Sequence, residues 1–179
     1  MLKMFSDNIV FWDTEFSSSD PYKAEIISVG MVKKSGEELY LELKVPEYTS
    51  DWVKKVVSPL LTDRKISREE ARVEIDKFLG DDKPYLMADW DKFDTTFLYK
   101  LYDIKENNPK EMKWNWNSVD FRSVLFALGI DPSRMSTTHE NNLYQELGVN
   151  YKGYREHHAL DDAKLLREVY LALEKRENK

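Results

Sequence analysis

The chain has 179 residues, 41% apolar and 34% charged, which suits one globular domain with a sizeable core. Its formal net charge of −6 argues against sequence-blind binding to long duplexes, which needs a basic face, although bound metal ions would add positive charge that this count misses. The absence of cysteine excludes disulfides, thiolate catalysis and cysteine-based zinc sites, and fits a cytoplasmic protein.

The first quarter of the chain predicts three strands in quick succession. They are expected over residues 9–14, 25–34 and 38–45, with the polar segment KKSGEE as the turn between the last two. Short connections of this kind favour an antiparallel meander. No apolar run approaches the ~18 residues of a membrane span, and the first residues lack the apolar core of a secretory signal.

Helices dominate the rest of the chain. The first is predicted over 67–80, because Ser67 and Glu70 form a capping box and Gly80 is placed to end the helix. A short buried strand is expected over 84–88. Apolar periodicity then predicts four more helices, over 91–102, 118–129 (capped by Ser118), 138–147 and 159–175. This order indicates a mixed α/β sheet with helices on its faces.

Two acids stand at the end of the first predicted strand, in the segment IVFWDTEF. Side chains two residues apart in a strand project to the same face, so Asp13 and Glu15 present their carboxylates together. In isolation, such a pair is more often a set of turn residues at a strand end. The acids elsewhere in the chain favour a second interpretation.

A third acid, Asp94, follows Phe93 at the beginning of a predicted helix that comes after a buried strand. Its ordinary interpretation is a charge that complements the helix N-terminus, an effect worth about 0.3–1 kcal/mol. Asp89 and Asp91 are nearby competitors for the same role, but neither directly follows the apolar Phe93.

The segment HHALDDA adds a histidine and a fourth acid. His157 is expected in the loop just before the last helix and Asp162 in its first turns, so both side chains can face one cleft. Solvated loop histidines and ordinary first-turn acids are the alternative interpretation.

Taken together, these residues specify a complete chemistry. Four carboxylates in one cleft repel each other and cannot all ionise without compensation, which two hard cations, Mg²⁺ or Mn²⁺, would provide. Two such ions about 3.5–4 Å apart activate a water and stabilise a leaving oxygen in phosphodiester hydrolysis. A histidine with a pKa near neutrality can deprotonate that water.

At this point the chain resembles the DEDDh 3′–5′ exonucleases. Asp13-x-Glu15 after an apolar strand, Asp94 after Phe93, and His157 five residues before Asp162 look like the three motifs of that superfamily, in the right order across almost the entire chain. The start WDTEF looks most like the single-domain exoribonucleases of the RNase AS type, with phage exodeoxyribonucleases as close relatives.

The resemblance implies an RNase H-like fold, a mixed five-stranded sheet with helices on both faces, with residues 1–179 as a single exonuclease domain. It implies that Asp13 bridges two metals, that Glu15 and Asp162 complete the tighter site, that Asp94 serves the second site, and that His157 is the general base. The substrate would be the 3′ end of RNA or DNA, the products nucleoside 5′-monophosphates, and the assembly a homodimer.

Two aromatic residues are candidate substrate contacts. The resemblance implies that Phe16, which follows the Glu, packs on the terminal base. Many family members carry His-Asn ahead of the Phe-Asp motif, whereas this chain has Asp89-Trp90. Trp90 either stacks on a base, a contact worth about 1–3 kcal/mol, or packs in the core. Trp114 and Trp116 are more readily interpreted as structural plugs than as a stacking platform.

Three functions are compatible with these residues. The leading hypothesis is a metal-dependent 3′–5′ exoribonuclease, and the nearest rival is a DNA exonuclease with the same acids, since discrimination requires contacts to the 2′-OH that the sequence does not reveal. A catalytically silent nucleic-acid-binding module is disfavoured because it needs none of the five residues.

Overall fold

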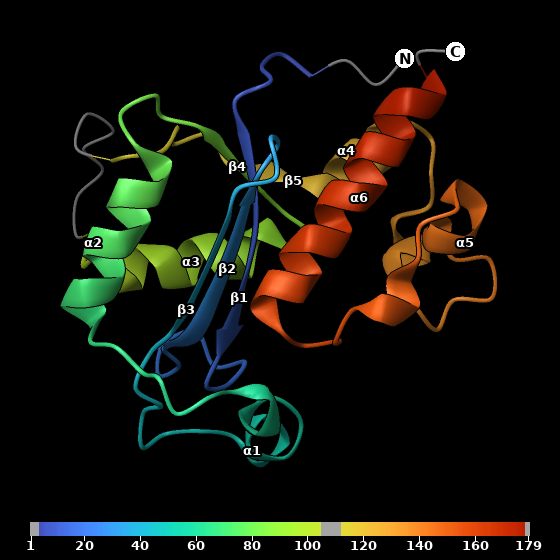
Figure 1. Ribbon diagram of the computed structural model, residues 1–179. Helices are drawn as coiled ribbons and strands as arrows, with labels where there is room; N and C mark the ends of the chain where they lie inside the picture. Colours follow the sequence, from blue (N-terminus) through green and yellow to red (C-terminus); the bar gives the residue numbers. More distant parts are fainter. Residues whose placement is uncertain (1–3, 105–111, 178–179) are drawn as a thin grey trace.

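The computed structural model describes residues 4–104 and 112–177, and its centre is one mixed sheet (Figure 1). Five strands lie in the order β3-β2-β1-β4-β5. The strands β1, β2 and β3 pair antiparallel, as the predicted meander requires, whereas β1–β4 and β4–β5 are parallel. Their bounds are Ile9–Phe16 (β1), Ile26–Lys33 (β2), Glu38–Glu42 (β3), Tyr85–Ala88 (β4) and Val119–Asp120 (β5). The expected mixed five-stranded sheet is confirmed.

Six α-helices lie in the described parts of the chain, and three short 3₁₀ turns join them. The helices are α1 (Asp51–Val56), α2 (Arg68–Leu79), α3 (Asp91–Leu101), α4 (Phe121–Ala127), α5 (Leu143–Leu147) and α6 (Ala159–Glu177). Within the described ranges, none of them is long and apolar enough to cross a membrane.

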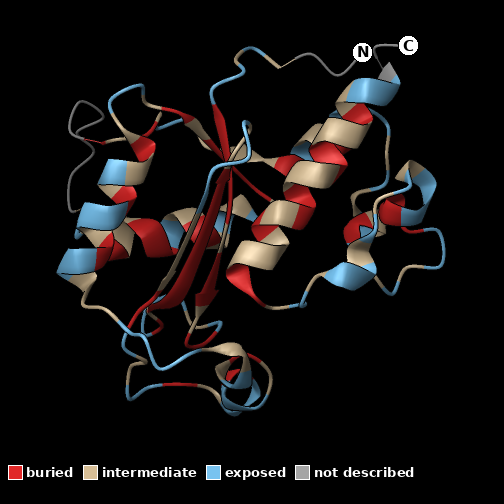
Figure 2. Ribbon diagram, viewed as in Figure 1, coloured by how far each residue is buried: buried red, intermediate tan, exposed pale blue. Residues whose placement is uncertain are grey.

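Alternation along the central strand produces a core on each face of the sheet. Val10 and Trp12 contribute to a cluster with α2 and α3, while Ile9 and Phe11 pack with α4, α5 and α6. Figure 2 shows β1 and β2 almost entirely buried and exposed residues on the outer face of α2, whereas the outer face of α6 is mostly of intermediate burial until its last turn. Since Asp13 continues the series of Phe11, the same alternation turns its side chain toward α6.

Gly30 explains how closely α6 approaches the sheet. It pairs with Asp13 across β1 and β2, and a Cβ built on it would lie 2.3 Å from the backbone of Ala159, the first residue of α6. Any side chain there would push the helix away. Glycine at this position therefore brings the start of α6 directly over the strand that carries Asp13.

Several boundaries differ from the sequence prediction. The helix predicted from 118 starts at Phe121 with Asp120 as its cap, because the preceding pair forms the short strand β5. The helix predicted from 138 starts at Leu143, since Asn142 accepts the capping hydrogen bond from Gln145. The helix over 67–80 and its Ser67–Glu70 capping box are confirmed, while α1 was not predicted.

The two tryptophans that follow α3 behave differently from each other. Trp114 is buried and meets Tyr102 edge to face at 4.9 Å, which fits the structural interpretation. Trp116 is exposed. Part of the segment proposed as a stacking platform, Lys110 included, lies outside the described residues.

Candidate active site

Three carboxylates meet where β1 passes under the start of α6. Asp13 and Glu15 project from the same face of β1, and Asp162 comes from the first turn of α6. One carboxylate oxygen from each of the three lies within 4.8 Å of the other two. The two-residue spacing in the strand and the close approach of α6 at Gly30 together produce this cluster.

The fourth acid, Asp94, lies in the first turn of α3 and is buried. Its Oδ1 accepts two hydrogen bonds from Thr14, one from the backbone N–H at 2.9 Å and one from the hydroxyl at 2.6 Å. Both bonds fall on the residue between Asp13 and Glu15, so α3 is fastened to β1 between the two strand acids.

The four acids repel each other, and burial adds to the effect. Burial, followed by the charges of Asp94 and Asp162, raises the pKa of Asp13 well above its usual range. Burial, with Asp162 next, raises the pKa of Glu15 to about 8. Burial is also the main reason that the pKa values of Asp94 and Asp162 rise to about 7. The protein therefore retains protons on these carboxyls near neutral pH unless cations compensate their charge.

These residues fit hard divalent cations. The donors are carboxylate oxygens, which suit Mg²⁺ and Mn²⁺, and their clustering within 4.8 Å lets several of them reach a single ion. The raised pKa values show that the uncompensated cluster is electrostatically unfavourable. Asp13, Glu15 and Asp162 would hold an ion directly, and Asp94 lies close enough to raise the pKa of both strand acids.

His157 lies in the turn before α6, as the sequence predicts. Its backbone is left-handed, with a φ of 61°, and its N–H donates a hydrogen bond that lowers the pKa of the Asp162 carboxyl. Its ring meets the edge of Trp52, from α1, with the ring centres 5.0 Å apart. The imidazole is thus placed beside the acids by a turn and one aromatic contact.

The neighbouring His158 points elsewhere. It is buried, stacks on Tyr40 of β3 at 4.4 Å, and its Nδ1 accepts a weak hydrogen bond from the backbone N–H of Asp161. Burial and the charge of Arg155 lower its pKa. His158 therefore packs the start of α6 against the sheet, and it lines neither of the cavities beside the acids.

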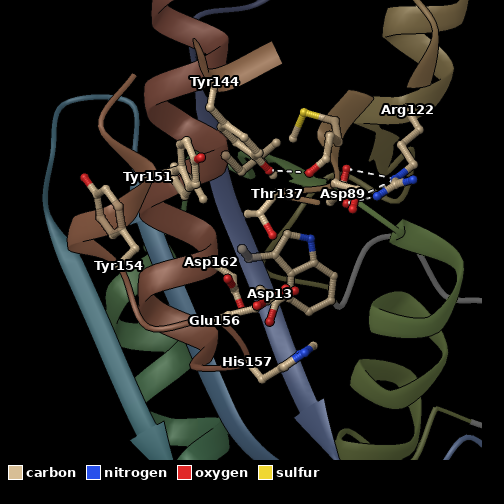
Figure 3. A pocket seen from close by; sticks show the side chains of 15 residues that line it. Asp13, Asp89, Arg122, Thr137, Tyr144, Tyr151, Tyr154, Glu156, His157 and Asp162 are labelled. Atoms are coloured by element: carbon tan, nitrogen blue, oxygen red, sulfur yellow. Dashed lines mark hydrogen bonds and ion pairs between the residues drawn. The ribbon is translucent and has the colours of Figure 1, made fainter. Parts of the chain in front are cut away.

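Two cavities open on the acids, and their linings share only Asp13 and His157. The first, of about 300 Å³, lies between α4, α5 and α6 and has the Asp89–Arg122 ion pair in its wall (Figure 3). We name it the Arg122 cavity. The second, of about 430 Å³, lies between the end of β1, α1 and the start of α3. We name it the Phe16 cavity.

Both predicted substrate contacts line the Phe16 cavity. Phe16 stacks on Phe97 at 4.5 Å and Phe93 lies 6.0 Å away, so its ring is fixed while part of it remains accessible. Trp90 is exposed, with 46% of its surface accessible, which contradicts the alternative that it packs in the core. An aromatic wall of this kind suits a nucleobase.

Asp89 and Arg122 were not predicted as a pair. The sequence offers Asp89 as a competitor of Asp94, whereas in the structure its carboxylate accepts three hydrogen bonds from Arg122 at 2.8–3.1 Å. The two residues are 33 positions apart, so no local pattern connects them. Gly30 was also missed, although a glycine inside an apolar strand is a known sign of close backbone approach.

Comparison with known proteins identifies the family. The profile of the family described as 3′-5′ exoribonuclease Rv2179c-like domain matches residues 8–173. No curated protein matched the sequence.

Several solved structures share the fold. The crystal structure of cell-death related nuclease 4 (CRN-4) has a TM-score of 0.65 and 14% identity over 94% of this chain and 64% of that one. The zinc-bound form of the E. coli ExoI–ssDNA complex has a TM-score of 0.66 and 14% identity over 96% of this chain and 41% of that one. The crystal structure of E. coli Exonuclease I in complex with a dT13 oligonucleotide has a TM-score of 0.64 and 13% identity over 93% of this chain and 40% of that one. The chain spans less than two thirds of each of these chains, and the likeness confirms the RNase H-like exonuclease fold.

Proposed function

Because the chain belongs to the family of the 3′-5′ exoribonuclease Rv2179c-like domain, within the DEDD-type 3′–5′ exonucleases, we propose that it shortens RNA from the 3′ end and releases nucleoside 5′-monophosphates. The observation that carries this proposal is the convergence of Asp13, Glu15 and Asp162 within 4.8 Å at the strand end. We further propose that the enzyme is of the RNase AS type and that residues 1–179 act as one exonuclease domain.

In this proposal the acids would hold divalent cations, and through them the reacting phosphate would be bound and oriented. When bound, two divalent ions, Mg²⁺ or Mn²⁺, supply the positive charge that the phosphate needs and lower the pKa of a water. Asp13, Glu15 and Asp162 would hold the tighter ion and Asp94 would serve the second. Thr14 keeps Asp94 in place through its two hydrogen bonds, so the four ligands are preorganised by β1 and the helices that touch it.

His157 accepts the proton of the attacking water. The water attacks phosphorus, the bond from phosphorus to the 3′ oxygen of the penultimate nucleotide breaks, and that oxygen takes a proton from solvent, to which His157 then returns the proton it accepted. His157 lines both cavities together with Asp13, so a water that binds in either cavity shares its surroundings with this imidazole. This placement supports the role of general base.

The terminal nucleotide occupies the Phe16 cavity. Phe16 is held by Phe97 and contacts the base, while Trp90 at the exposed rim stacks on it. Substitution of either ring by Ala should raise KM more than it lowers kcat, since stacking stabilises the bound substrate and the transition state alike.

End-labelled oligonucleotides test the proposal directly. Purified protein is incubated with RNA and DNA of one sequence, labelled at the 5′ or the 3′ end, in Mg²⁺, Mn²⁺ or EDTA. We expect stepwise shortening from the 3′ end that EDTA abolishes and faster turnover of RNA. Faster turnover of DNA would identify the rival exodeoxyribonuclease, and activity that persists in EDTA would contradict the metal-dependent mechanism.

A further inference from the structure

The Arg122 cavity has an unusual charge balance. Asp13, Asp89, Glu156 and Asp162 all line it, yet the substrate that must reach these acids is itself a polyanion. Among the described residues that line either cavity, Arg122 is the only lysine or arginine. Any phosphate of the substrate that enters this cavity and does not lie at the acids therefore has one cationic side chain to meet.

Arg122 is fixed in place and still has donors to offer. Its Nε donates to both carboxylate oxygens of Asp89 at 3.1 Å, and its Nη2 donates to Oδ2 at 2.8 Å. The guanidinium also lies over the ring of Trp90, 4.9 Å from the ring centre. Within the described residues, Nη1 meets no acceptor, and the side chain remains 25% exposed. A guanidinium held on one edge and open on the other is preorganised to bind a phosphate.

The reaction geometry indicates which phosphate this is. An in-line displacement places the attacking water and the leaving oxygen on opposite sides of phosphorus. Figure 3 shows His157 at one end of the cavity, the Asp89–Arg122 pair at the other, and Asp13 and Asp162 between them. With the water activated by His157, the 3′ oxygen of the penultimate nucleotide, which is the leaving group, points toward Arg122.

We infer that the Arg122 cavity is the subsite for the penultimate nucleotide, and that Nη1 of Arg122 binds the backbone phosphate on the 5′ side of that nucleotide. This inference rests on the proposed exonuclease function. It assigns a separate task to each of two neighbouring residues. Asp89 orients the guanidinium, and Trp90 supports it from one face while lining the neighbouring Phe16 cavity.

The alternative is a purely structural role. Burial raises the pKa of Asp89, and the Arg122 charge opposes that rise, so the arginine could serve only to neutralise a buried carboxylate. In that case, removing both charges together would restore the activity that is lost when Arg122 alone is replaced. If Arg122 binds a phosphate, replacing its partner as well cannot restore that activity.

Oligonucleotides with one neutral linkage separate the two roles. A methylphosphonate replaces the phosphate at the second, third or fourth linkage from the 3′ end, with a 2′-deoxy sugar at each modified nucleotide and in the matched controls, because a 2′-OH would cleave the neutral linkage. We expect the wild-type kcat/KM to fall roughly 10–100-fold when the second linkage is neutral, the scale of one charge-assisted contact, and less at the others.

Arg122→Gln should lose the same factor on the unmodified substrate and show no further loss when the second linkage is neutral. Arg68→Gln is the matched control, since Arg68 also pairs with a carboxylate, Glu25 at 3.2 Å, but lines neither cavity. It should keep the wild-type response to every neutral linkage. An Arg122→Gln enzyme that remains as sensitive to the second linkage as the wild type would overturn the inference.

The double variant Asp89→Asn/Arg122→Gln leaves no unpaired charge and carries the test if Arg122→Gln fails to fold. We expect it to stay weak and insensitive to the second linkage. Recovery of wild-type rate and sensitivity would establish the structural role and overturn phosphate binding. If the wild type shortens the unmodified oligonucleotide but ignores the neutral linkage, this inference alone fails. A wild type that shortens neither substrate contradicts the proposed function itself.

Discussion

The acids and the histidine of the site are held by different kinds of structure. Asp13 and Glu15 extend from the central strand, and two hydrogen bonds from Thr14 bind Asp94 to that strand. His157 lies instead in a turn with a left-handed backbone, and its ring meets Trp52, a half-exposed residue of the short helix α1.

This difference fits the task that we propose for each group. Acids that repel one another must be kept together by regular structure, because nothing in their own chemistry favours their proximity. A proton acceptor must approach a water and later release its proton, so a turn suits it better than a strand. We therefore expect substitutions of the acids and substitutions of His157 to differ in the size of their effect on turnover and in the kinetic step that they affect.

Substitution of the central acid should have the largest effect. Asp13→Asn removes the carboxylate that meets both Glu15 and Asp162, so turnover should fall roughly 10⁴-fold or more, the scale for loss of a central catalytic group. Circular dichroism should be unchanged, and metal titration by calorimetry should show weakened binding. Near-normal activity in this variant would show that the metals bind elsewhere.

Loss of the histidine should be smaller and should spare metal binding. His157→Ala is expected to lower kcat roughly 10²–10⁴-fold, the usual range for a general base, with metal affinity unchanged. His158→Gln is the matched control, because its ring packs on Tyr40 and lines neither cavity. It should lower the melting temperature rather than kcat. The reverse pattern between the two histidines would reassign the base to His158.

Gly30 affects both the acids and the histidine, because it allows the start of α6 to lie against β1. Asp162 lies in the first turn of α6, and His157 lies in the turn before this helix. Gly30→Ala should move the helix outward and lower kcat by roughly 10²-fold, because a misplacement of about 1 Å can cost that much. Metal affinity should fall as well, which separates this variant from His157→Ala. Gly153→Ala is the control, as its added Cβ would meet its nearest neighbour at 3.8 Å. Equal losses in both variants would contradict this role of Gly30.

The sequence could predict the strand acids and the last helix for a physical reason. The acids belong to an apolar strand and the last helix has a long apolar face, and the periodicity of each element fixes which face each of its residues occupies. It could not predict β5, whose two residues are too few to show alternation, or the late start of α5 at Leu143, where the capping hydrogen bond to Asn142 overrides the pattern. The Asp89–Arg122 pair is set by tertiary packing alone.

The Phe16 and Arg122 cavities show the same limit at the level of the site. Phe16 could be named as a substrate contact because it follows Glu15 in a motif that resembles a known family. Arg122 has no motif around it, and its importance appears only when the fold brings it into one cavity with Asp13 and Asp162. Local pattern thus predicts the candidate catalytic acids, while the residues that we propose to orient the substrate are brought together by the packing of distant elements.

The smallest expected effect concerns the acids without metal, and it tests whether their repulsion is real. Burial and mutual repulsion raise the pKa of Glu15 to about 8 and those of Asp94 and Asp162 to about 7. In the unfolded chain these carboxyls ionise near pH 4, so between about pH 4 and 8 the folded state binds more protons than the unfolded state. The free energy of unfolding then falls as pH rises through this window.

In EDTA, the melting temperature should therefore decrease by several degrees from about pH 5 to pH 8, and Asp162→Asn should reduce that decrease. Saturating Mg²⁺ should oppose it, because metal binds the ionised cluster of the folded state and stabilises that state by mass action. Differential scanning calorimetry with and without Mg²⁺ measures both effects. A melting temperature that rises over this range in EDTA would mean that the acids do not repel one another, and that no cation is needed to compensate their charge.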